Sequence, residues 1–275
     1  MIIMQRNKQP QFSIITICFN SSATIERTIK SVLAQTFTDY EYIIVDGGSK
    51  DSTLDIVKKY EPLFEGRMKW KSEPDKGIYD AMNKGIQRST GDIIGIVNSD
   101  DWLEPTAMES IAKVAGSVDY VNALICGSMK FHYNDGRVQL FCTDEQKFNA
   151  GIKNYSFNYG AYHPAIWVGK NVYENVGLFD TNYRTAADID FIYRCYLAKS
   201  KFYFTKDVVS NMSDGGISNH INWKYFISDK KYYVKKYRYS RVGGWLYIAK
   251  ICTLAFIRQY VPSGLFKAYR KHKLK

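Results

Sequence analysis

Two adjacent carboxylates, Asp100 and Asp101, directly follow an apolar run, Ile93 to Val97, that predicts a buried strand. They close the sequence Asn98-Ser99-Asp100-Asp101, after which Pro105 predicts the start of a helix. Neighbouring acids at the end of a buried strand are costly unless a positive charge lies between them. A divalent Mg²⁺ or Mn²⁺, held by one or two carboxylates and by phosphate oxygens, would supply that charge. A polar turn that caps the next helix is the alternative.

A glycine-rich turn is the second feature with chemical potential, and it lies in the sequence VDGGSKDST from Val45 to Thr53. Glycines let a ligand approach the backbone closely, and Asp46 could accept a hydrogen bond from a base or a ribose. A tight strand-to-helix connection with a capping residue explains the same residues equally well. The turn lacks the G-x-G-x-x-G spacing of dinucleotide sites and the G-K-[ST] ending of a P-loop, so those two classes are disfavoured.

A third acidic pair, Asp188 and Asp190, lies near the predicted start of a helix in the sequence ADID. Asp188 at a helix N-terminus could simply cap that helix. The alternative is a general base, a carboxylate that removes a proton from a substrate hydroxyl.

These side chains need elements that position them, and the first hundred residues alternate short apolar runs with helical patterns. The predicted strands are Phe12–Phe19, Tyr42–Val45, the edge-like Arg67–Lys71 and Ile93–Val97. The predicted helices carry Ile25 to Leu33, Asp51 to Tyr60 and Ile78 to Ile86. Strands separated by helices predict a mostly parallel α/β sheet, whose ligands lie beyond the carboxyl ends of the strands. We expect all of these polar clusters to lie at such ends.

The second half of the chain is less regular. Three strands are predicted, with a hairpin turn at Asn134-Asp135-Gly136 between the last two: Tyr120–Cys126, Lys130–Tyr133 and Val138–Phe141. The Tyr- and Asn-rich stretch from Phe148 to Tyr162 predicts a long loop, and a helix is expected near Asp188.

The composition indicates a globular protein, because 45% of the 275 residues are hydrophobic and 24% are charged. The five cysteines are odd in number and lack metal-site spacing, which favours a reduced, cytoplasmic chain. Residues 1–11 show no signal-peptide pattern.

The net charge of +11 is concentrated at the C-terminus. Residues 221–275 contain 14 Lys and Arg against one acid, Asp229, so they carry +13, and the first 220 residues carry 24 bases and 26 acids, or −2. Within this segment, Trp245 to Val261 predicts an apolar helix that is too short and too charged to span a bilayer. A helix lying in an anionic membrane surface fits better. The alternative is packing on the domain or on a second subunit of a homo-oligomer.

Taken in order, these segments resemble the glycosyltransferase family 2 proteins of the GT-A fold over about residues 10 to 220. The matching stretches are FSIITICFNSSATIERTIKSVLAQTFTDYEYIIVDGGSKDST, EPDKGIYDAMNKGI, GDIIGIVNSDDWLEP, HPAIW, GLFDTNYRTAADIDF and GGIS. The chain is most similar to bacterial transferases that build capsular, exopolysaccharide or O-antigen repeat units.

The resemblance implies inverting, metal-dependent transfer from a nucleotide sugar. It assigns Asp100 and Asp101 to the metal and Asp188 to the base, in a family position often written Glu-Asp where Ala187 stands here. Many relatives have a second acid where Gly47 stands, and that acid can read the base. The positions that match the nucleotide-sugar site are Thr16, Cys18, Asn20, Asp46, Gly47, Ser49, Asp75, Lys76, Gly77, Asn98 and Asp100. The acceptor-side positions are His163, Asp190, Gly215, Gly216 and Ser218.

We therefore expect an α/β GT-A domain over residues 1–220, with a nucleotide-sugar half at about 10–101 and an acceptor half at 102–220. Residues 221–275 are expected to form a basic helical element. The expected reaction transfers a sugar, from a UDP-sugar, to a saccharide linked to a polyprenyl diphosphate at the inner face of the cell membrane. One alternative is a nucleotidyltransferase that makes sugar nucleotides. The other is a non-catalytic module that binds membrane or nucleic acid, and the near-neutral main domain disfavours nucleic acid.

Overall fold

Three buried runs rich in β-branched residues and one partly exposed edge strand form four parallel strands in the first hundred residues. In spatial order they are β3 (Met68–Ser72), β2 (Tyr40–Asp46), β1 (Phe12–Cys18) and β4 (Ile93–Ile96). All residues of β1, β2 and β4 are buried, as expected for a parallel sheet that is covered on both faces. The mostly parallel α/β arrangement predicted from the sequence is confirmed for this half of the chain.

The same sheet continues through strands of mixed direction. Outward from β4, the order is β8 (Ile166–Gly169), β6 (Ala123–His132), β9 (Lys201–Ser213) and β5 (Trp102–Leu103), and β7 (Val138–Phe141) pairs with the far end of β6. β8 is antiparallel to both β4 and β6, β9 is parallel to β6, and β5 is antiparallel to β9. The computed structural model describes residues 11–152, 160–215, 222–237 and 240–260, and in this part the sheet has nine strands.

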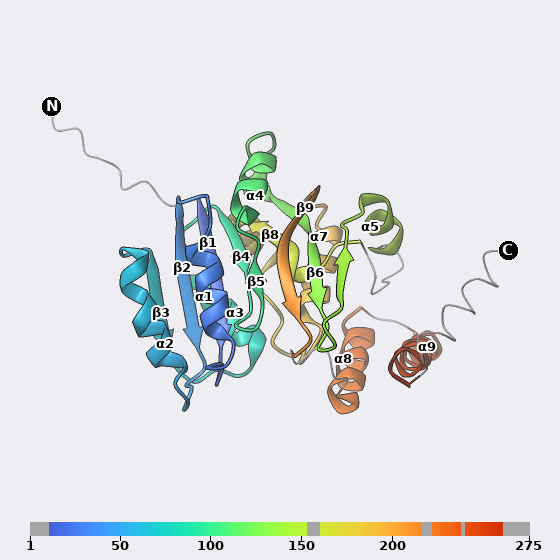
Figure 1. Cartoon of the computed structure of the whole chain (residues 1–275). Coiled ribbons are helices and arrows are strands. Elements are labelled where there is room, and N and C mark those ends of the chain that lie inside the picture. Colours follow the sequence, from blue (N-terminus) through green and yellow to red (C-terminus); the bar gives the residue numbers. More distant parts are fainter. Residues whose placement is uncertain (1–10, 153–159, 216–221, 238–239, 261–275) are drawn as a thin grey trace. The chain divides into compact units, whose positions relative to one another are not determined.

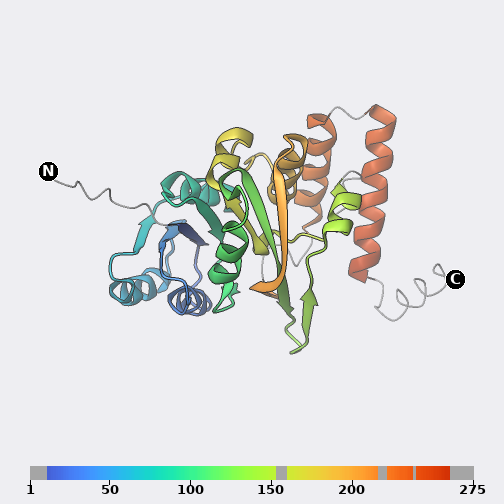
Figure 2. The same ribbon diagram turned by 90° about the horizontal axis from the view of Figure 1, so that it is seen from above.

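Helices cover both faces of the parallel strands (Figure 1). α1 (Ile25–Leu33) and α2 (Thr53–Tyr60) lie on one face, and α3 (Ile78–Arg88) lies on the other, as the view from above shows (Figure 2). α1 buries Ile25, Ile29 and Val32 at helical spacing. Gly85 lets α3 approach β1, since a β-carbon on that glycine would lie 2.4 Å from the Ile15 side chain.

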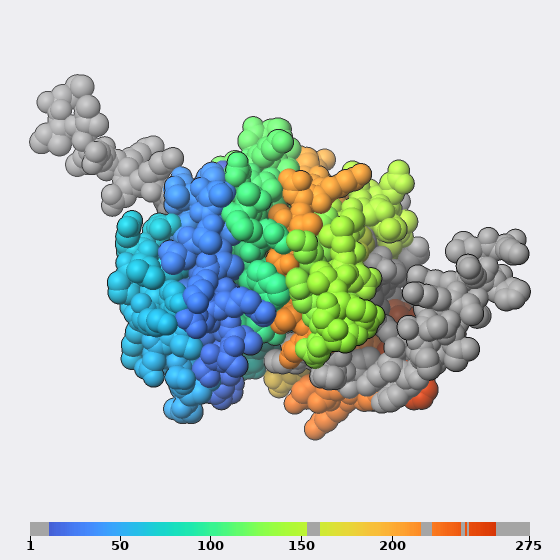
Figure 3. Space-filling model, viewed as in Figure 1, coloured from blue at the N-terminus to red at the C-terminus, as the bar shows by residue number. Residues whose placement is uncertain are grey.

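The remaining helices of the larger unit follow the later strands. They are α4 (Ala107–Ala115), α5 (Glu145–Ile152), α6 (Lys170–Val176), α7 (Ala187–Leu197) and the 3₁₀ turns η1 (Glu61–Phe64), η2 (Tyr120–Asn122) and η3 (His163–Ala165). On the face shown in space-filling view, the green band that includes β5 and α4 lies between blue α1 and orange β9 (Figure 3). The segment that follows Asp101, which forms β5 and α4, is therefore flanked by α1 on one side and by β9 on the other.

Two sequence expectations for the second half are wrong. The two strands predicted at Tyr120–Cys126 and Lys130–Tyr133 are one strand, β6, which starts at Ala123 after η2 and ends at His132. β9 pairs with it along its length, across an irregularity at Cys126 to Met129. The predicted loop from Phe148 begins inside α5, which buries Phe148 and Ile152. Part of that stretch, residues 153–159, lies outside the described residues.

A second, smaller unit combines residues 182–185 with the described residues from 222 onward. α8 (Trp223–Lys236) begins at Asn222, whose side chain accepts a hydrogen bond from the Tyr225 amide. Asp229, the one acid of the basic segment, is buried and accepts hydrogen bonds from the backbone amides of Arg184 and Thr185. This carboxylate ties α8 to an earlier segment of the chain.

The predicted apolar helix at the C-terminus is present as α9 (Arg241–Tyr260). On this helix Ile248 and Ile251 are buried, while Trp245 and Phe256 are exposed. The exposed apolar stripe of α9 consists of Val242, Trp245, Leu246 and Phe256. Over the described part of the chain, we find no helix with the length and apolarity that crossing a membrane requires.

Candidate active site

The turn after β2 is held together by Asp46. Its carboxylate accepts hydrogen bonds from the amides of Gly48 and Ser49 at 3.0 and 2.9 Å, and from the Ser72 hydroxyl at 2.7 Å. Burial would raise the pKa of this carboxyl, but the hydrogen bonds from Ser49, Ser72 and Gly48 outweigh it and lower the pKa. Asp46 is fully buried. Its buried carboxylate therefore fixes the shape of the glycine turn.

Residues of β1 and of the bend that follows it support the same turn. Asn20 receives a hydrogen bond at its side-chain oxygen from the Lys50 amide, and its own amide donates to Ser49 Oγ, both at 2.8 Å. Cys18 lies buried with its sulfur 3.6 Å from Asp46 Oδ1, and burial, followed by the charge of Asp46, raises the pKa of its thiol. Thr16 is buried deeper in β1 and accepts a hydrogen bond from the Tyr42 hydroxyl. Of Thr16, Cys18 and Asn20, only Asn20 is exposed, just beyond the carboxyl end of β1.

The acidic loop after β4 is anchored by backbone contacts from two other elements. From α1, Arg27 donates to the Asp100 carbonyl at 2.6 Å and Thr28 donates to the Asp101 carbonyl at 2.6 Å. From the end of β9, Ser213 donates its amide to Asp101 Oδ1 at 3.0 Å and its hydroxyl to the Asp100 carbonyl at 2.7 Å. The two carboxylates are thus held in place by segments that lie far apart in the sequence.

The electrostatics of this loop are dominated by burial of the acidic pair, which the nearby charge of Arg27 offsets only in part. Asp101 is only 2% exposed, and burial, followed by the charge of Asp100, raises the pKa of its carboxyl to about 7. Burial also raises the pKa of Asp100. Beside them, the buried side-chain oxygen of Asn98 has no hydrogen-bond partner among the described residues. Two carboxylates and a free amide oxygen are donors that suit a hard divalent cation.

Asp100 and Asp101 therefore fit a divalent cation. In sites of this kind, phosphate oxygens of the substrate supply further ligands. Within the described ranges, no group of three or more His, Cys, Asp or Glu side chains gathers as a complete metal site.

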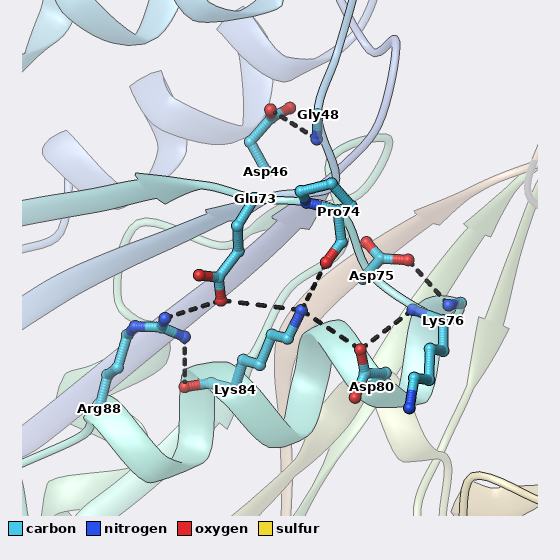
Figure 4. A network of polar contacts seen from close by, with 10 residues as sticks. Asp46, Gly48, Glu73, Pro74, Asp75, Lys76, Asp80, Lys84 and Arg88 are labelled. Carbon is cyan, nitrogen blue, oxygen red and sulfur yellow. Dashed lines mark hydrogen bonds and ion pairs between the residues drawn. The ribbon is translucent and has the colours of Figure 1, made fainter.

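The loop after β3 carries the predicted residues Asp75, Lys76 and Gly77, and polar contacts fix it from several sides (Figure 4). Gly77 has a φ of 119° and precedes α3, and its amide donates to Asp75 Oδ1 at 2.8 Å. The Lys76 amide donates to Asp80 in the first turn of α3. Further along the same helix, Lys84 Nζ donates to the Pro74 carbonyl at 2.8 Å.

Asp188 lies in the first turn of α7, where the sequence predicted it. It is half-buried, and its Oδ1 accepts a hydrogen bond of 3.1 Å from the hydroxyl of Tyr79 on α3. Burial, followed by the charge of Asp188, raises the pKa of Tyr79 well above its usual value. The phenol therefore remains a proton donor, and Asp188 is held from the side of the loop that carries Asp75.

The other predicted acceptor-side residues have separate surroundings. Asp190 is fully buried and forms an ion pair with Arg194 Nε at 2.8 Å, so it faces the interior of the fold. His163 borders a small, mostly apolar cavity, and burial lowers the pKa of its imidazole while Asp188 opposes that shift. Gly215 is exposed at the end of β9, whereas Gly216 and Ser218 lie outside the described residues.

The sequence reasoning missed Tyr79 and Ser213 as supports of the acids. Tyr79 stands in the quoted stretch EPDKGIYDAMNKGI, but nothing local in the sequence indicates that it reaches a residue 109 positions later. Ser213 acts through its backbone amide as well as its hydroxyl, and an amide contact leaves no signal in residue type.

Four parallel strands continued by strands of mixed direction, with an acidic pair after β4, form the arrangement that the resemblance to GT-A glycosyltransferases led us to expect. The chain belongs to glycosyl transferase family 2, because the sequence model of that family matches residues 13–163. It is also 32% identical over 227 residues to a PGL/p-HBAD biosynthesis glycosyltransferase of Mycobacterium tuberculosis, covering 79% of this chain and 83% of that protein. The family and the enzyme class expected from the sequence are confirmed.

Solved structures share the fold at low sequence identity. The S. aureus TarS 1–349 fragment in complex with UDP-GlcNAc aligns with a TM-score of 0.58 and 18% identity over 85% of this chain and 74% of that one. This chain spans 38% of the longer S. aureus TarS chain. A Pyrobaculum calidifontis mannosyltransferase in complex with GDP-Man and Mn²⁺ aligns with a TM-score of 0.61 and 15% identity, over 98% and 82% of the two chains. The expected GT-A fold is confirmed by these likenesses.

Proposed function

We propose that this enzyme transfers a sugar from a nucleotide sugar, in first place a UDP-sugar, to a hydroxyl of a saccharide acceptor, with inversion at the anomeric carbon. The observation that carries the proposal is the acidic pair of half-buried Asp100 and buried Asp101, which has donors suited to a cation and is anchored by α1 and by the end of β9. That neighbours of the same fold bind UDP-GlcNAc, or GDP-Man with Mn²⁺, supports both the donor class and the metal.

In this mechanism Asp188 acts as the general base. It removes the proton from the acceptor hydroxyl as that oxygen attacks the anomeric carbon from the face opposite the nucleotide. Tyr79 occupies Oδ1, so Oδ2 is the oxygen that receives the proton. Asp100 and Asp101 would hold Mn²⁺ or Mg²⁺, which offsets the charge that develops on the departing diphosphate.

A panel of nucleotide sugars tests this proposal directly. The protein is incubated with Mn²⁺ and each donor, and release of the free nucleotide is measured. We expect slow hydrolysis of at least one UDP-sugar in the absence of acceptor, and faster release once a suitable saccharide is added. A protein that neither binds nor hydrolyses any donor would contradict the proposal.

Tyr79→Phe should lower kcat about 3- to 10-fold and leave the KM for the donor nearly unchanged. The change removes one hydrogen bond to the base, worth about 0.5–1.5 kcal/mol, and keeps the ring that packs on Phe179. Steady-state kinetics on the single and double variants measure the effect. In an Asp188→Asn background Tyr79→Phe should have no further effect on kcat, and an equal loss in both backgrounds would show that Tyr79 acts only on the fold.

We further propose a lipid-linked saccharide acceptor at the cytoplasmic face of the membrane. The +13 charge of residues 221–275 is complementary to an anionic bilayer. On α9, Trp245 and Leu246 are 62% and 67% exposed, and the apolar stripe that they share with Val242 and Phe256 suits insertion into the interface. Charge and apolar surface thus lie in the same segment, which is what stable peripheral binding requires.

Deleting residues 240–275 should release the protein from anionic vesicles, because the deletion removes eight Lys and Arg, each contributing about 1 kcal/mol near such a surface, together with the apolar stripe. Vesicle co-sedimentation measures the loss. Transfer to a lipid-linked acceptor should slow more than hydrolysis of the donor. High salt should reproduce only the electrostatic part.

Point variants separate the stripe from the rest of the segment. Trp245→Asp should weaken vesicle binding more than Leu254→Asp, since Leu254 is 50% exposed outside the stripe. If the intact protein ignores anionic vesicles, the segment is a packing element and the membrane proposal is wrong.

A further inference from the structure

The close approach of Asp75 to Gly47 is a feature that the mechanism does not use. A β-carbon on Gly47 would lie 2.4 Å from Asp75 Oδ2 and 3.3 Å from Asp75 Cγ. The next residue, Gly48, has a φ of +89° and needs glycine for its backbone conformation, but Gly47 has no such φ. The carboxylate of Asp75 therefore fills the space that a side chain at position 47 would occupy.

The loop that carries Asp75 is rigidly supported (Figure 4). The Glu73 amide donates to the Asp46 carbonyl at 2.9 Å. Lys84 holds the Pro74 carbonyl and also pairs with Glu73 and Asp80. With the Gly77 amide on Oδ1, the orientation of the Asp75 carboxylate is set before any ligand binds.

The second oxygen of this carboxylate is available to a ligand. Among the described residues, no hydrogen bond reaches Asp75 Oδ2, and the side chain is partly exposed. Asp46, the neighbouring acid, cannot substitute for it, because it is fully buried and its oxygens accept hydrogen bonds from Gly48, Ser49 and Ser72. Of these two carboxylates, Asp75 is therefore the one that a bound molecule can reach.

The sheet order indicates which part of the donor lies there. Gly47 follows β2, Asp100 and Asp101 follow β4, and one strand separates β2 from β4. Two strand spacings amount to about 10 Å, a distance that the nucleoside part of a donor spans when its diphosphate lies at the acidic pair. The base of the donor then lies beside Asp75 and Gly47.

We propose that Asp75 reads the base of the donor from the place that a side chain at position 47 would take, and so selects bases with a ring N–H. A carboxylate only accepts hydrogen bonds, so it pairs with the ring N–H of uracil, thymine or guanine. It repels the ring nitrogen that cytosine and adenine present as an acceptor at the corresponding position. This inference rests on the proposed nucleotide-sugar donor and narrows it to one class of base.

Equilibrium binding of UDP, GDP, dTDP, CDP and ADP with Mn²⁺ tests the inference. The wild-type protein should bind its best diphosphate of the first three at least about tenfold tighter than CDP and ADP, the scale of one charge-assisted hydrogen bond. Asp75→Asn, which keeps the shape but can turn its amide to donate, should reduce this preference to about threefold or less. An Asp75→Asn protein that folds and keeps the full preference overturns the inference.

Two further variants test the exchange between positions 47 and 75. Gly47→Asp should abolish nucleotide binding while Asp75 is present, because the new β-carbon meets Asp75 Oδ2. The double variant Gly47→Asp with Asp75→Gly should recover the preference for ring N–H bases. A folded double variant that discriminates no better than Asp75→Gly contradicts the exchange.

A control separates this inference from the proposed function. Asp100→Asn lies at the diphosphate end, so it should weaken all five nucleotides by a similar factor and leave their ratios unchanged. If the wild-type protein binds none of the five, the nucleotide-sugar proposal fails. If it binds them without preference for a ring N–H, only the role of Asp75 fails.

Discussion

Asp101→Asn is expected to abolish sugar transfer and to reduce binding of the nucleotide by at least an order of magnitude in the presence of Mn²⁺. Asp101→Ala and Asp100→Ala should have the same effect, because each removes a carboxylate from the cation site. Transfer assays and nucleotide titrations with and without EDTA measure the loss. Full activity of the wild-type protein in EDTA, with metal carry-over excluded, would contradict the metal assignment.

The same change should stabilise the metal-free protein. The pKa of Asp101 is raised from 3.8 to about 7, so the folded state holds a proton that the unfolded state has lost between these pH values. The free energy of unfolding of the wild-type protein should therefore fall as the pH rises from about 4 to 7, and Asp101→Asn should remove this slope. Above pH 7 we expect the variant to be more stable by on the order of 1 kcal/mol or more, measured by thermal unfolding in EDTA.

An isosteric amide can satisfy the contacts at position 101. Its oxygen can accept from the Ser213 amide. In the wild-type protein Asn98 Nδ2 donates to Asp101 Oδ2, so the new amide nitrogen can be satisfied once the Asn98 amide turns over and presents its oxygen, which lacks a partner among the described residues. Wild-type stability equal to or above that of the variant at pH 8 in EDTA would show that the acidic pair carries no strain.

Asp188→Asn is expected to lower kcat by about 10² or more, with folding and donor binding preserved. The amide cannot take the proton from the acceptor hydroxyl, yet it can still accept the hydrogen bond from Tyr79 at the same oxygen. Single-turnover transfer and nucleotide binding are the measurements.

Asp190→Asn provides the matched control for position 188. Asp190 is fully buried in its ion pair with Arg194, so its loss should lower thermal stability and leave kcat of the folded protein within a few-fold of wild type. The reverse outcome, with Asp188→Asn near wild-type turnover, would move the base elsewhere.

The sequence was most informative where a function depends on local order. Apolar runs followed by polar turns predicted β1, β2 and β4 together with the clusters that follow β2 and β4, because the side chains that form these features are neighbours in the chain. Asp188 was likewise placed at the start of its helix. The burial of Asp46 could not be predicted in this way, since one of its partners, Ser72, lies 26 residues away.

Strand β9, in contrast, could not be predicted from the local sequence. Its thirteen residues, KFYFTKDVVSNMS, mix charges and hydroxyls with apolar side chains and carry no clear period. They form a strand because β6 and β5 pair with them, and the side chain of Val209 lies within 2.6 Å of where a β-carbon on Gly127 would be. Without β9 in view, β6 is read as two pieces and the support of Asp101 by Ser213 is invisible.

Helix α3 belongs to the first of the two halves expected from the sequence, but its side chains also contact the second half. Asp80 and Lys84 of this helix hold the loop of Asp75. Of the residues next to them, Tyr79 holds Asp188, and Asn83 exchanges hydrogen bonds with the backbone of Phe179. A chimaera joined at residue 101 would therefore combine the α3 of one parent with the Asp188 region of another. Recombination that changes the donor but keeps the acceptor must therefore keep α3 compatible with both the Asp75 loop and the Asp188 region. An exchange of whole halves succeeds only between parents whose α3 and Asp188 regions fit each other.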